Sequence, residues 1–209
     1  CNQVPESFEA TNDPGTTIHR AERDCVRSRA ERDCVRSRTE RGGLRPDDAN
    51  RLRDSERDAL RHVRHVIVTS PSTARLLVSD YDVAMERISV AKPGNDPVAP
   101  SRGSGEAPLH LLAVGSIVPR KGYDVLVAAL AELKDLSWRL SIVGDPSRDP
   151  DCASALDRDI ARLGLDSRVA RLGAVSQQVL AGLYGGTDLF VLPSRFEGYG
   201  MAFADAIAF

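Results

Sequence analysis

The chain has 209 residues, 42% of them hydrophobic, which is enough for one or two domains with a buried core. Its formal net charge is −2, from 28 basic and 30 acidic residues, so the charge balance gives no reason to expect nucleic acid or an anionic membrane as a partner. The four cysteines lack CxxC or Cys/His ligand spacing, and no apolar run reaches the roughly 20 residues that span a bilayer. We therefore expect a globular cytoplasmic protein with neither a metal site nor a disulfide framework.

Residues 1–43 differ in composition from the rest of the chain. The nine-residue sequence AERDCVRSR occurs twice in tandem, at 21–29 and 30–38. Each repeat has one weak apolar pair, which is too little for a buried helical stripe, and two copies cannot stack into a solenoid. We leave 1–43 unassigned and expect a solvated helix or disorder there.

Residues 44–97 contain a short run of alternating elements. Apolar residues recur at helical spacing through 49–63, and the β-branched run HVIVTS (65–70) predicts a strand. Ser70-Pro71 is typical of a helix N-terminus, and RISV (87–90) predicts a second strand that ends at PGNDP. The Pro/Gly/Ser-rich stretch 98–108 that follows predicts a linker.

Residues 109–209 alternate regularly between apolar strands and amphipathic helices. The expected strands are 109–115, 138–144, 169–175 and 188–194, and the expected helices are 123–134, 153–163, 177–184 and one that begins near 200. This alternation predicts βαβ units, and so an α/β fold with a Rossmann-like parallel sheet. Ligands of such sheets bind beyond the carboxyl ends of the strands, so the loops there are the candidate site.

The loop after the first of these strands carries two cations. Gly115 permits a close turn, and Arg120 and Lys121 precede Gly122 at the start of the next helix. Cations beside free N–H groups at a helix N-terminus suit a phosphate group. Taken alone, the loop fits a solvated turn with two surface cations equally well.

The loop after the fourth strand carries a carboxylate. Glu197 stands just before Gly198 and Gly200, whose N–H groups lack a covering side chain, and Asp205 follows eight residues after Glu197. Carboxylates accept hydrogen bonds from paired hydroxyls. Together with the cationic loop, they predict a ligand with both phosphate and vicinal hydroxyl groups, which describes a nucleotide sugar.

Several motifs together resemble a known family. These are VIVTSPSTARLL, RISVAKPGNDP, VGSIVPRKGYDVLVAAL, RLGAV and DLFVLPSRFEGYGMAFADAIA, in this order along the chain. They are similar to motifs of the retaining nucleotide-sugar glycosyltransferases of family four, also called group 1, which have the two-domain GT-B fold. The similarity runs from about residue 39 to the end.

The resemblance implies roles for individual residues. Lys121 matches the lysine that neutralises the donor diphosphate, while Ser116 replaces the arginine that usually follows Gly115, and Arg120 is a candidate substitute. Glu197 and Asp205 match the two acidic positions of the E-x7-E motif, which face the donor sugar and the ribose.

Further positions follow from the same resemblance. The amides of Gly198, Tyr199 and Gly200 approach the sugar and phosphate, and Gly173 to Val175 lie where the nucleobase binds. Residues 93–96 match the hinge between the two domains. The resemblance thus assigns 44–97 to the end of the acceptor-binding N-terminal domain and 109–209 to the nucleotide-sugar-binding C-terminal domain.

The resemblance also implies an activity. Such enzymes transfer a glycosyl group with retention and without a metal or other cofactor, and the leaving diphosphate is thought to help deprotonate the acceptor. The resemblance does not identify the acceptor, which is a glycan, a lipid or a small molecule. It allows a peripheral membrane contact through the rest of the N-terminal domain.

Two alternatives accompany this expectation. A non-catalytic nucleotide-sugar binding module would carry the same donor motifs, whereas a dinucleotide-binding oxidoreductase is disfavoured because no G-x-G-x-x-G follows a strand. Family members have a longer N-terminal domain and a longer C-terminal sheet. We therefore expect a fragment with little or no transferase activity and an exposed sheet edge that is prone to aggregation.

Overall fold

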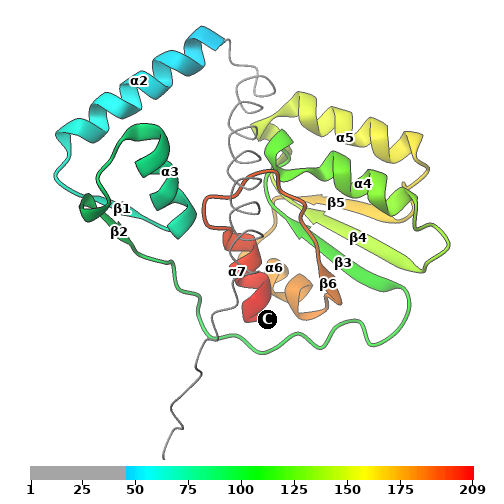
Figure 1. Ribbon diagram of the computed structural model, residues 1–209. Helices are drawn as coiled ribbons and strands as arrows, with labels where there is room; N and C mark the ends of the chain where they lie inside the picture. The colour runs from blue at the N-terminus through cyan, green and yellow to red at the C-terminus, as the bar shows by residue number, and fades with distance from the viewer. Residues whose placement is uncertain (1–45) are drawn as a thin grey trace, which may run out of the picture. The chain divides into compact units, whose positions relative to one another are not determined.

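The computed structural model describes residues 46–209 (Figure 1). The prediction for residues 1–43 lies outside this range. No helix of the described residues has the length and apolar character needed to cross a membrane.

The first described part has a two-stranded parallel sheet, and its elements in chain order are α2 (Pro46–His62), β1 (Val66–Val68), α3 (Pro71–Tyr81), the 3-10 turn η1 (Met85–Arg87) and β2 (Ile88–Val90). Helix α3 begins where the sequence predicts, because Ser70 accepts a hydrogen bond of 3.1 Å from the N–H of Thr73 and Pro71 is the first helical residue. Asp82, in the left-handed region at φ 56°, ends it.

The predicted linker is held against the elements that follow it. The hydroxyl of Ser101 donates to the carbonyl oxygens of Gly185 and Thr187, both at 3.0 Å. The hydroxyl of Ser104 donates to Oδ2 of Asp188 at 2.6 Å. These bonds anchor the segment at the amino-terminal end of β6 (Leu189–Phe190), the short strand that Asp188 precedes.

The second part is a four-stranded sheet whose strands are all parallel. Its elements are β3 (Leu109–Val114), η2 (Pro119–Lys121), α4 (Tyr123–Ala131), β4 (Trp138–Val143), η3 (Pro146–Arg148), α5 (Pro150–Arg162), β5 (Val169–Gly173), α6 (Gln177–Gly185), β6 (Leu189–Phe190) and α7 (Met201–Ala208). The strand order is β5-β4-β3-β6. The chain therefore builds outward from β3 to β5 and then crosses over, through α6, to the other side of β3.

Helices cover both faces of this sheet, with α4 and α5 on one side and α6 and α7 on the other (Figure 1). Successive residues of a strand point to opposite faces. Leu111 and Ala113 of β3 accordingly join the core beneath α4 and α5, while Leu112 joins the core around Tyr184 of α6. The central strand β3 accordingly has an unbroken buried run, Leu111 to Ala113, as expected for a strand covered on both faces, whereas β4 alternates between buried and more exposed positions at Trp138 to Ile142.

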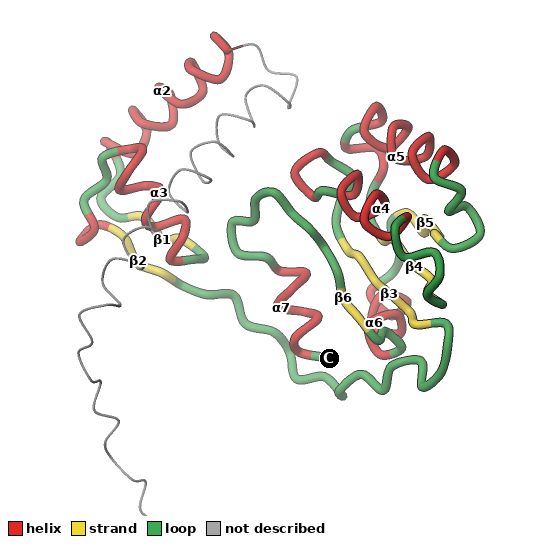
Figure 2. The backbone as a smooth tube through the Cα atoms, turned by 45° about the vertical axis from the view of Figure 1, so that its right-hand side comes forward, coloured by secondary structure: helices red, strands yellow, loops and turns green. Residues whose placement is uncertain are grey.

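Several elements are shorter than the sequence predicts, and β6 and α4 show the physical reason. Strand β6 pairs with β3 only at Leu189 and Phe190, and a long loop connects it to α7 (Figure 2). Pro193 has no N–H to donate to a neighbouring strand, and the N–H of Ser194 turns back to the carbonyl of Leu192 at 2.8 Å. Helix α4 ends at Ala131 instead of 134, because tighter turns follow, such as that of Leu133 onto Leu130.

Candidate functional site

Two loops meet at the carboxyl end of the sheet, one after β3 (115–122) and one after β6 (191–200). They meet because β3 and β6 are neighbours in the sheet. The helices that follow these two strands cover opposite faces of the sheet, so the gap between the strand ends is a topological switch point, where open α/β sheets bind ligands. Gly122, at φ 71°, packs so closely on Pro193 that a Cβ atom would collide with its carbonyl oxygen. The N–H of Arg195 donates to the carbonyl of Arg120 at 2.7 Å.

The side chain of Arg195 strengthens this connection. Its guanidinium binds both carboxylate oxygens of Asp124 in α4, at 2.9 and 2.6 Å, and donates to the carbonyl of Pro119 at 2.6 Å. Hydrogen bonding from Arg195 holds the pKa of Asp124 below its ordinary value, against the opposing effect of burial. A bidentate pair of this kind fixes the loop after β6 to the start of α4.

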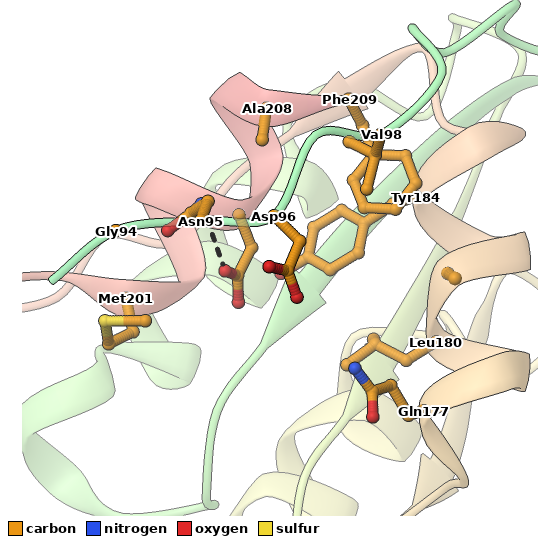
Figure 3. A pocket seen from close by; sticks show the side chains of 12 residues that line it. Gly94, Asn95, Asp96, Val98, Gln177, Leu180, Tyr184, Met201, Ala208 and Phe209 are labelled. Atoms are coloured by element: carbon orange, nitrogen blue, oxygen red, sulfur yellow. Dashed lines mark hydrogen bonds between the residues drawn. The ribbon is translucent and has the colours of Figure 1, made fainter.

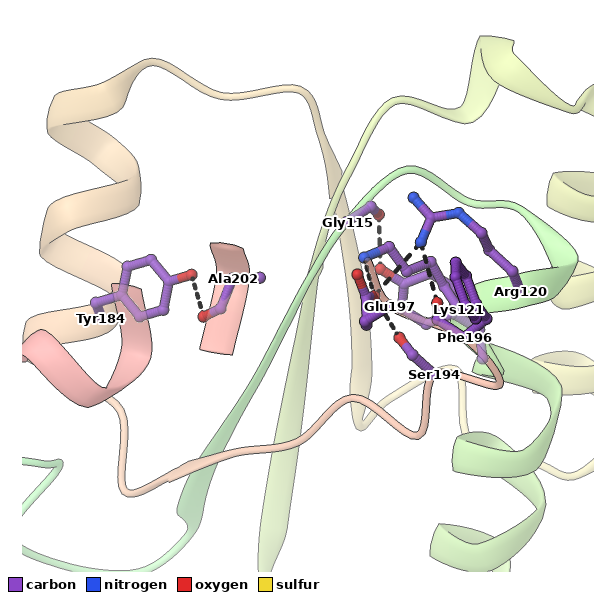
Figure 4. Close-up of polar contacts among 9 residues, drawn as sticks. Gly115, Arg120, Lys121, Tyr184, Ser194, Phe196, Glu197 and Ala202 are labelled. Carbon is purple, nitrogen blue, oxygen red and sulfur yellow. Dashed lines mark hydrogen bonds and ion pairs between the residues drawn. The ribbon is translucent and has the colours of Figure 1, made fainter. Parts of the chain in front are cut away.

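Lys121 and Glu197 form the centre of the site (Figure 4). The ammonium nitrogen of Lys121 lies 2.5 Å from Oε1 of Glu197. The same oxygen accepts a hydrogen bond of 2.8 Å from the hydroxyl of Ser194 and lies 3.5 Å from Nη1 of Arg120. Two cations and one hydroxyl thus converge on a single carboxylate oxygen.

Among the ion pairs of residues 46–209, this one has the most buried cation. The side chain of Lys121 is only 8% exposed and that of Glu197 21%, whereas Arg120 is 40% exposed. Burial raises the pKa of Glu197, but hydrogen bonds from Lys121 and Ser194 and the two positive charges outweigh it, so the pKa lies below its ordinary value. Glu197 is therefore ionised at neutral pH.

The backbone beneath Lys121 is held by a buried tyrosine. The hydroxyl of Tyr123 donates to the carbonyl of Gly115 at 2.6 Å, and burial raises the pKa of Tyr123, which keeps it a neutral donor. Gly115 lies directly under the Lys121 side chain, where a Cβ atom would come within 2.8 Å of Cε. Gly144, after β4, approaches the carbonyl of Gly115 too closely for a Cβ atom. Ser116 follows, half-buried.

The glycine-rich end of the second loop leaves donors free. Among residues 46–209, nothing accepts from the backbone N–H groups of Gly198, Tyr199 and Gly200. Gly200, at φ 89°, is the N-cap of α7. The hydroxyl of Tyr199 donates to the carbonyl of Pro93 at 3.1 Å.

A separate pocket of about 260 Å³ lies between α6, α7 and the segment that follows Pro93 (Figure 3). One of its lining residues is Asp205. Its Oδ1 accepts a hydrogen bond of 3.3 Å from Asn95. The pocket combines polar groups with an apolar wall, and is lined by Gly94, Asn95, Asp96, Val98, Gln177, Leu180, Ala181, Tyr184, Met201, Asp205, Ala208 and Phe209. Glu197 and Lys121 are not among its lining residues.

The two candidate base-binding positions, Gly173 at the end of β5 and Val175 just after it, both make contacts within the protein. The carbonyl of Gly173 accepts from the N–H of Gly144 at 2.9 Å. Val175 packs against the core of Leu112, Val143 and Tyr184. These contacts place both positions at the carboxyl edge of the sheet.

The structure brings Gly115, Arg120, Lys121 and Glu197 together, as the sequence motifs suggest. It adds residues that sequence reasoning missed, namely Ser194, Tyr123 and Arg195. Ser194 stands three residues before Glu197, but a serine in a loop carries no spacing signal. Within residues 46–209, no three His, Cys, Asp or Glu side chains group as metal ligands would.

Comparison with known proteins shows which family this part of the chain resembles. Residues 108–209, the four-stranded sheet with both loops, match the family described as "Glycosyl transferases group 1". Over these residues the chain belongs to the group 1 glycosyltransferases.

Curated relatives match a longer part of the chain than residues 108–209. Mannosylfructose-phosphate synthase of Agrobacterium fabrum is 31% identical over 160 residues, which cover 68% of this chain and 35% of that protein. D-inositol 3-phosphate glycosyltransferase of an Arthrobacter species is 31% identical over 182 residues, 79% of this chain and 42% of the relative. The chain thus spans well under half the length of these relatives.

Solved structures of similar proteins share the fold. Sucrose-phosphate synthase of Thermosynechococcus elongatus superposes with a TM-score of 0.62 at 25% identity, covering 74% of this chain and 41% of that one. The HepE protein of Anabaena, solved in complex with UDP and glucose, superposes with a TM-score of 0.63 at 24% identity, covering 75% and 45%. The α/β fold with parallel sheets, predicted from the sequence, is confirmed as the GT-B type.

Proposed function

We propose that this chain carries the donor site of a retaining glycosyltransferase, which transfers a sugar from a nucleoside diphosphate to an acceptor. The observation that carries the proposal is the buried Lys121–Glu197 pair at the switch point between β3 and β6. It joins a cation suited to phosphate and a carboxylate suited to sugar hydroxyls at the place where α/β sheets bind ligands. We also propose a domain organisation. Residues 44–97 form the end of the acceptor-binding domain, residues 98–108 form a linker, and residues 109–209 form the domain that binds the donor.

The cationic side of the site would hold the diphosphate. Lys121 and the more exposed Arg120 supply positive charge, and the free N–H groups of Gly198, Tyr199 and Gly200 supply hydrogen bonds. Because Lys121 is almost fully buried, its charge is weakly screened by water and acts strongly on a nearby anion. This charge would stabilise the diphosphate as it leaves the anomeric carbon.

The acidic groups would hold the hydroxyl groups of the donor. Glu197 is ionised and lies beside the cations, which suits a contact with the sugar. Asp205 lines a pocket with Tyr184 and Gln177, which suits a nucleoside. Gly173 and Val175 are not lining residues of this pocket, but Val175 packs in the same core as Tyr184, and both would lie near the base. The HepE protein, similar in fold, binds UDP and glucose, which supports a nucleotide sugar as the ligand class.

Calorimetry on the 209-residue chain tests this proposal, with UDP-glucose, GDP-mannose and ADP-glucose as probes. We expect one of them to bind, and Lys121→Met to weaken that binding at least about tenfold, since it removes a charge-assisted contact. Lys134→Met is the matched control, because Lys134 is exposed and follows α4 at the opposite end of that helix. Binding that Lys121→Met leaves unchanged, or no binding of any probe, would contradict the proposal.

A second measurement separates transfer from binding alone. Release of nucleoside diphosphate in the presence of acceptors would show turnover and would contradict the alternative of a non-catalytic binding module. The acceptor, whether glycan, lipid or small molecule, would be sought by testing one compound of each class in this assay. A cytoplasmic location stays a prediction from the cysteine spacing.

A further inference from the structure

The two oxygens of the Glu197 carboxylate have different environments. Oε1 accepts from Lys121 at 2.5 Å and from Ser194 at 2.8 Å, and Arg120 lies 3.5 Å away. No group of residues 46–209 hydrogen-bonds to Oε2. One oxygen is therefore saturated by the protein while the other is open to a ligand.

Lys121 alone cannot determine which oxygen of Glu197 is bonded by the protein and which is left for a ligand. An ammonium group is a point charge on a flexible stem, and it attracts either carboxylate oxygen equally well. A hydroxyl donor on a short side chain, in contrast, selects one oxygen and one rotation of the carboxylate. Only Ser194 meets that description among the groups that contact Glu197.

The backbone on both sides of Ser194 is anchored. Before it, Pro193 packs directly on Gly122. After it, the N–H of Arg195 donates to the carbonyl oxygen of Arg120 at 2.7 Å, and the guanidinium of Arg195 binds the carboxylate of Asp124. The N–H of Ser194 itself bonds to the carbonyl of Leu192 at 2.8 Å. The hydroxyl is therefore held in place before any ligand arrives, as preorganised sites require.

From this geometry we propose that Ser194 is a positioning residue, which turns the Glu197 carboxylate so that Oε2 is presented to the donor sugar. This inference rests on the proposed nucleotide-sugar function. It concerns only the sugar part of the donor, because the contacts of Lys121 and Arg120 with a diphosphate do not depend on the rotation of Glu197.

The first test needs no ligand. Ser194→Ala removes a donor to the charged form of Glu197, so the pKa of that carboxyl should rise, measured by carbon NMR on glutamate-labelled protein. Ser194→Thr, which keeps the hydroxyl, should restore the wild-type titration. Ser104→Ala is the matched control: Ser104 also donates to a carboxylate, that of Asp188, at 2.6 Å, but at the amino-terminal end of β6. An unchanged Glu197 pKa in Ser194→Ala would overturn the inference.

The second test compares each nucleotide sugar with its own nucleoside diphosphate: UDP-glucose with UDP, GDP-mannose with GDP, and ADP-glucose with ADP. Ser194→Ala should weaken binding of the sugar nucleotide about 3- to 10-fold, the effect of one hydrogen bond, and leave the diphosphate within about 2-fold. Equal weakening of both would show a structural role and overturn the inference. If wild type binds no probe, the proposed function fails, and so does the proposed role of Ser194 in binding the donor sugar. The NMR titration still decides whether Ser194 fixes the orientation of the Glu197 carboxylate.

Discussion

The ammonium of Lys121 and the carboxylate of Glu197 meet at 2.5 Å although 76 residues separate them in the chain. Each reaches the other from a loop at the carboxyl end of a different strand. The contact exists because β3 and β6 are neighbours in the sheet. It ties the stability of the two loops to the charges that the proposed function requires.

A double-mutant cycle should detect the energetic coupling between Lys121 and Glu197. Lys121→Met and Glu197→Gln each leave a largely buried charge without its partner, and each should lower the free energy of unfolding by about 2 kcal/mol, measured in urea. The double variant should lose less than the sum, with a coupling of about 1–3 kcal/mol. Losses that simply add would show that the pair contributes no mutual stabilisation.

The pH dependence of stability should report Glu197. The pKa of Glu197 in the folded protein lies below the ordinary value of a glutamate, so its stabilisation is complete above that ordinary pKa and is lost as pH falls through the folded pKa. The difference in unfolding free energy between wild type and Glu197→Gln should be largest near pH 7 and shrink below about pH 4.5. Urea melts at a series of pH values measure it, and a constant difference would contradict the assignment.

Gly122→Ala should disrupt the contact between the two loops. The residue has φ 71°, and an added Cβ atom would collide with the carbonyl of Pro193. We expect a loss of at least about 2 kcal/mol, from the left-handed conformation and the clash together. Gly182→Ala is the control, because Gly182 lies within α6 with nothing within 4 Å of the new atom, and alanine favours a helix there. Equal melting of Gly122→Ala and wild type would refute the close approach.

Asp205→Asn should reveal the ribose contact that we propose. If Asp205 accepts from the ribose hydroxyls, wild type should bind a ribonucleotide more tightly than its 2′-deoxy analogue, and Asp205→Asn should reduce that preference about 3- to 10-fold. Calorimetry with UDP and 2′-deoxy-UDP, or the GDP and ADP pairs, measures it. Asp135→Asn, at an exposed turn, is the control. An unaltered preference in Asp205→Asn would remove the ribose from this pocket.

Local patterns sufficed for most of the elements. The Ser70-Pro71 start of α3 and the apolar runs of β3, β4 and β5 appear where the sequence places them, because capping and apolar periodicity act over a few residues. The length of β6 did not follow from its sequence. That strand stops at Phe190 although LFVLPS continues as an apolar run, because Pro193 and the turn at Ser194 prevent further pairing.

The sequence by itself determined the α/β alternation, the family motifs and the kinds of side chain in each loop, since these depend on neighbours in the chain. Only the tertiary structure decided which loops meet. The order β5-β4-β3-β6 joins Lys121 to Glu197 and adds Ser194 to the same carboxylate oxygen, while Asp205 faces a different pocket. The physical reason is that strand order depends on how a whole sheet buries its two faces, which no local pattern encodes.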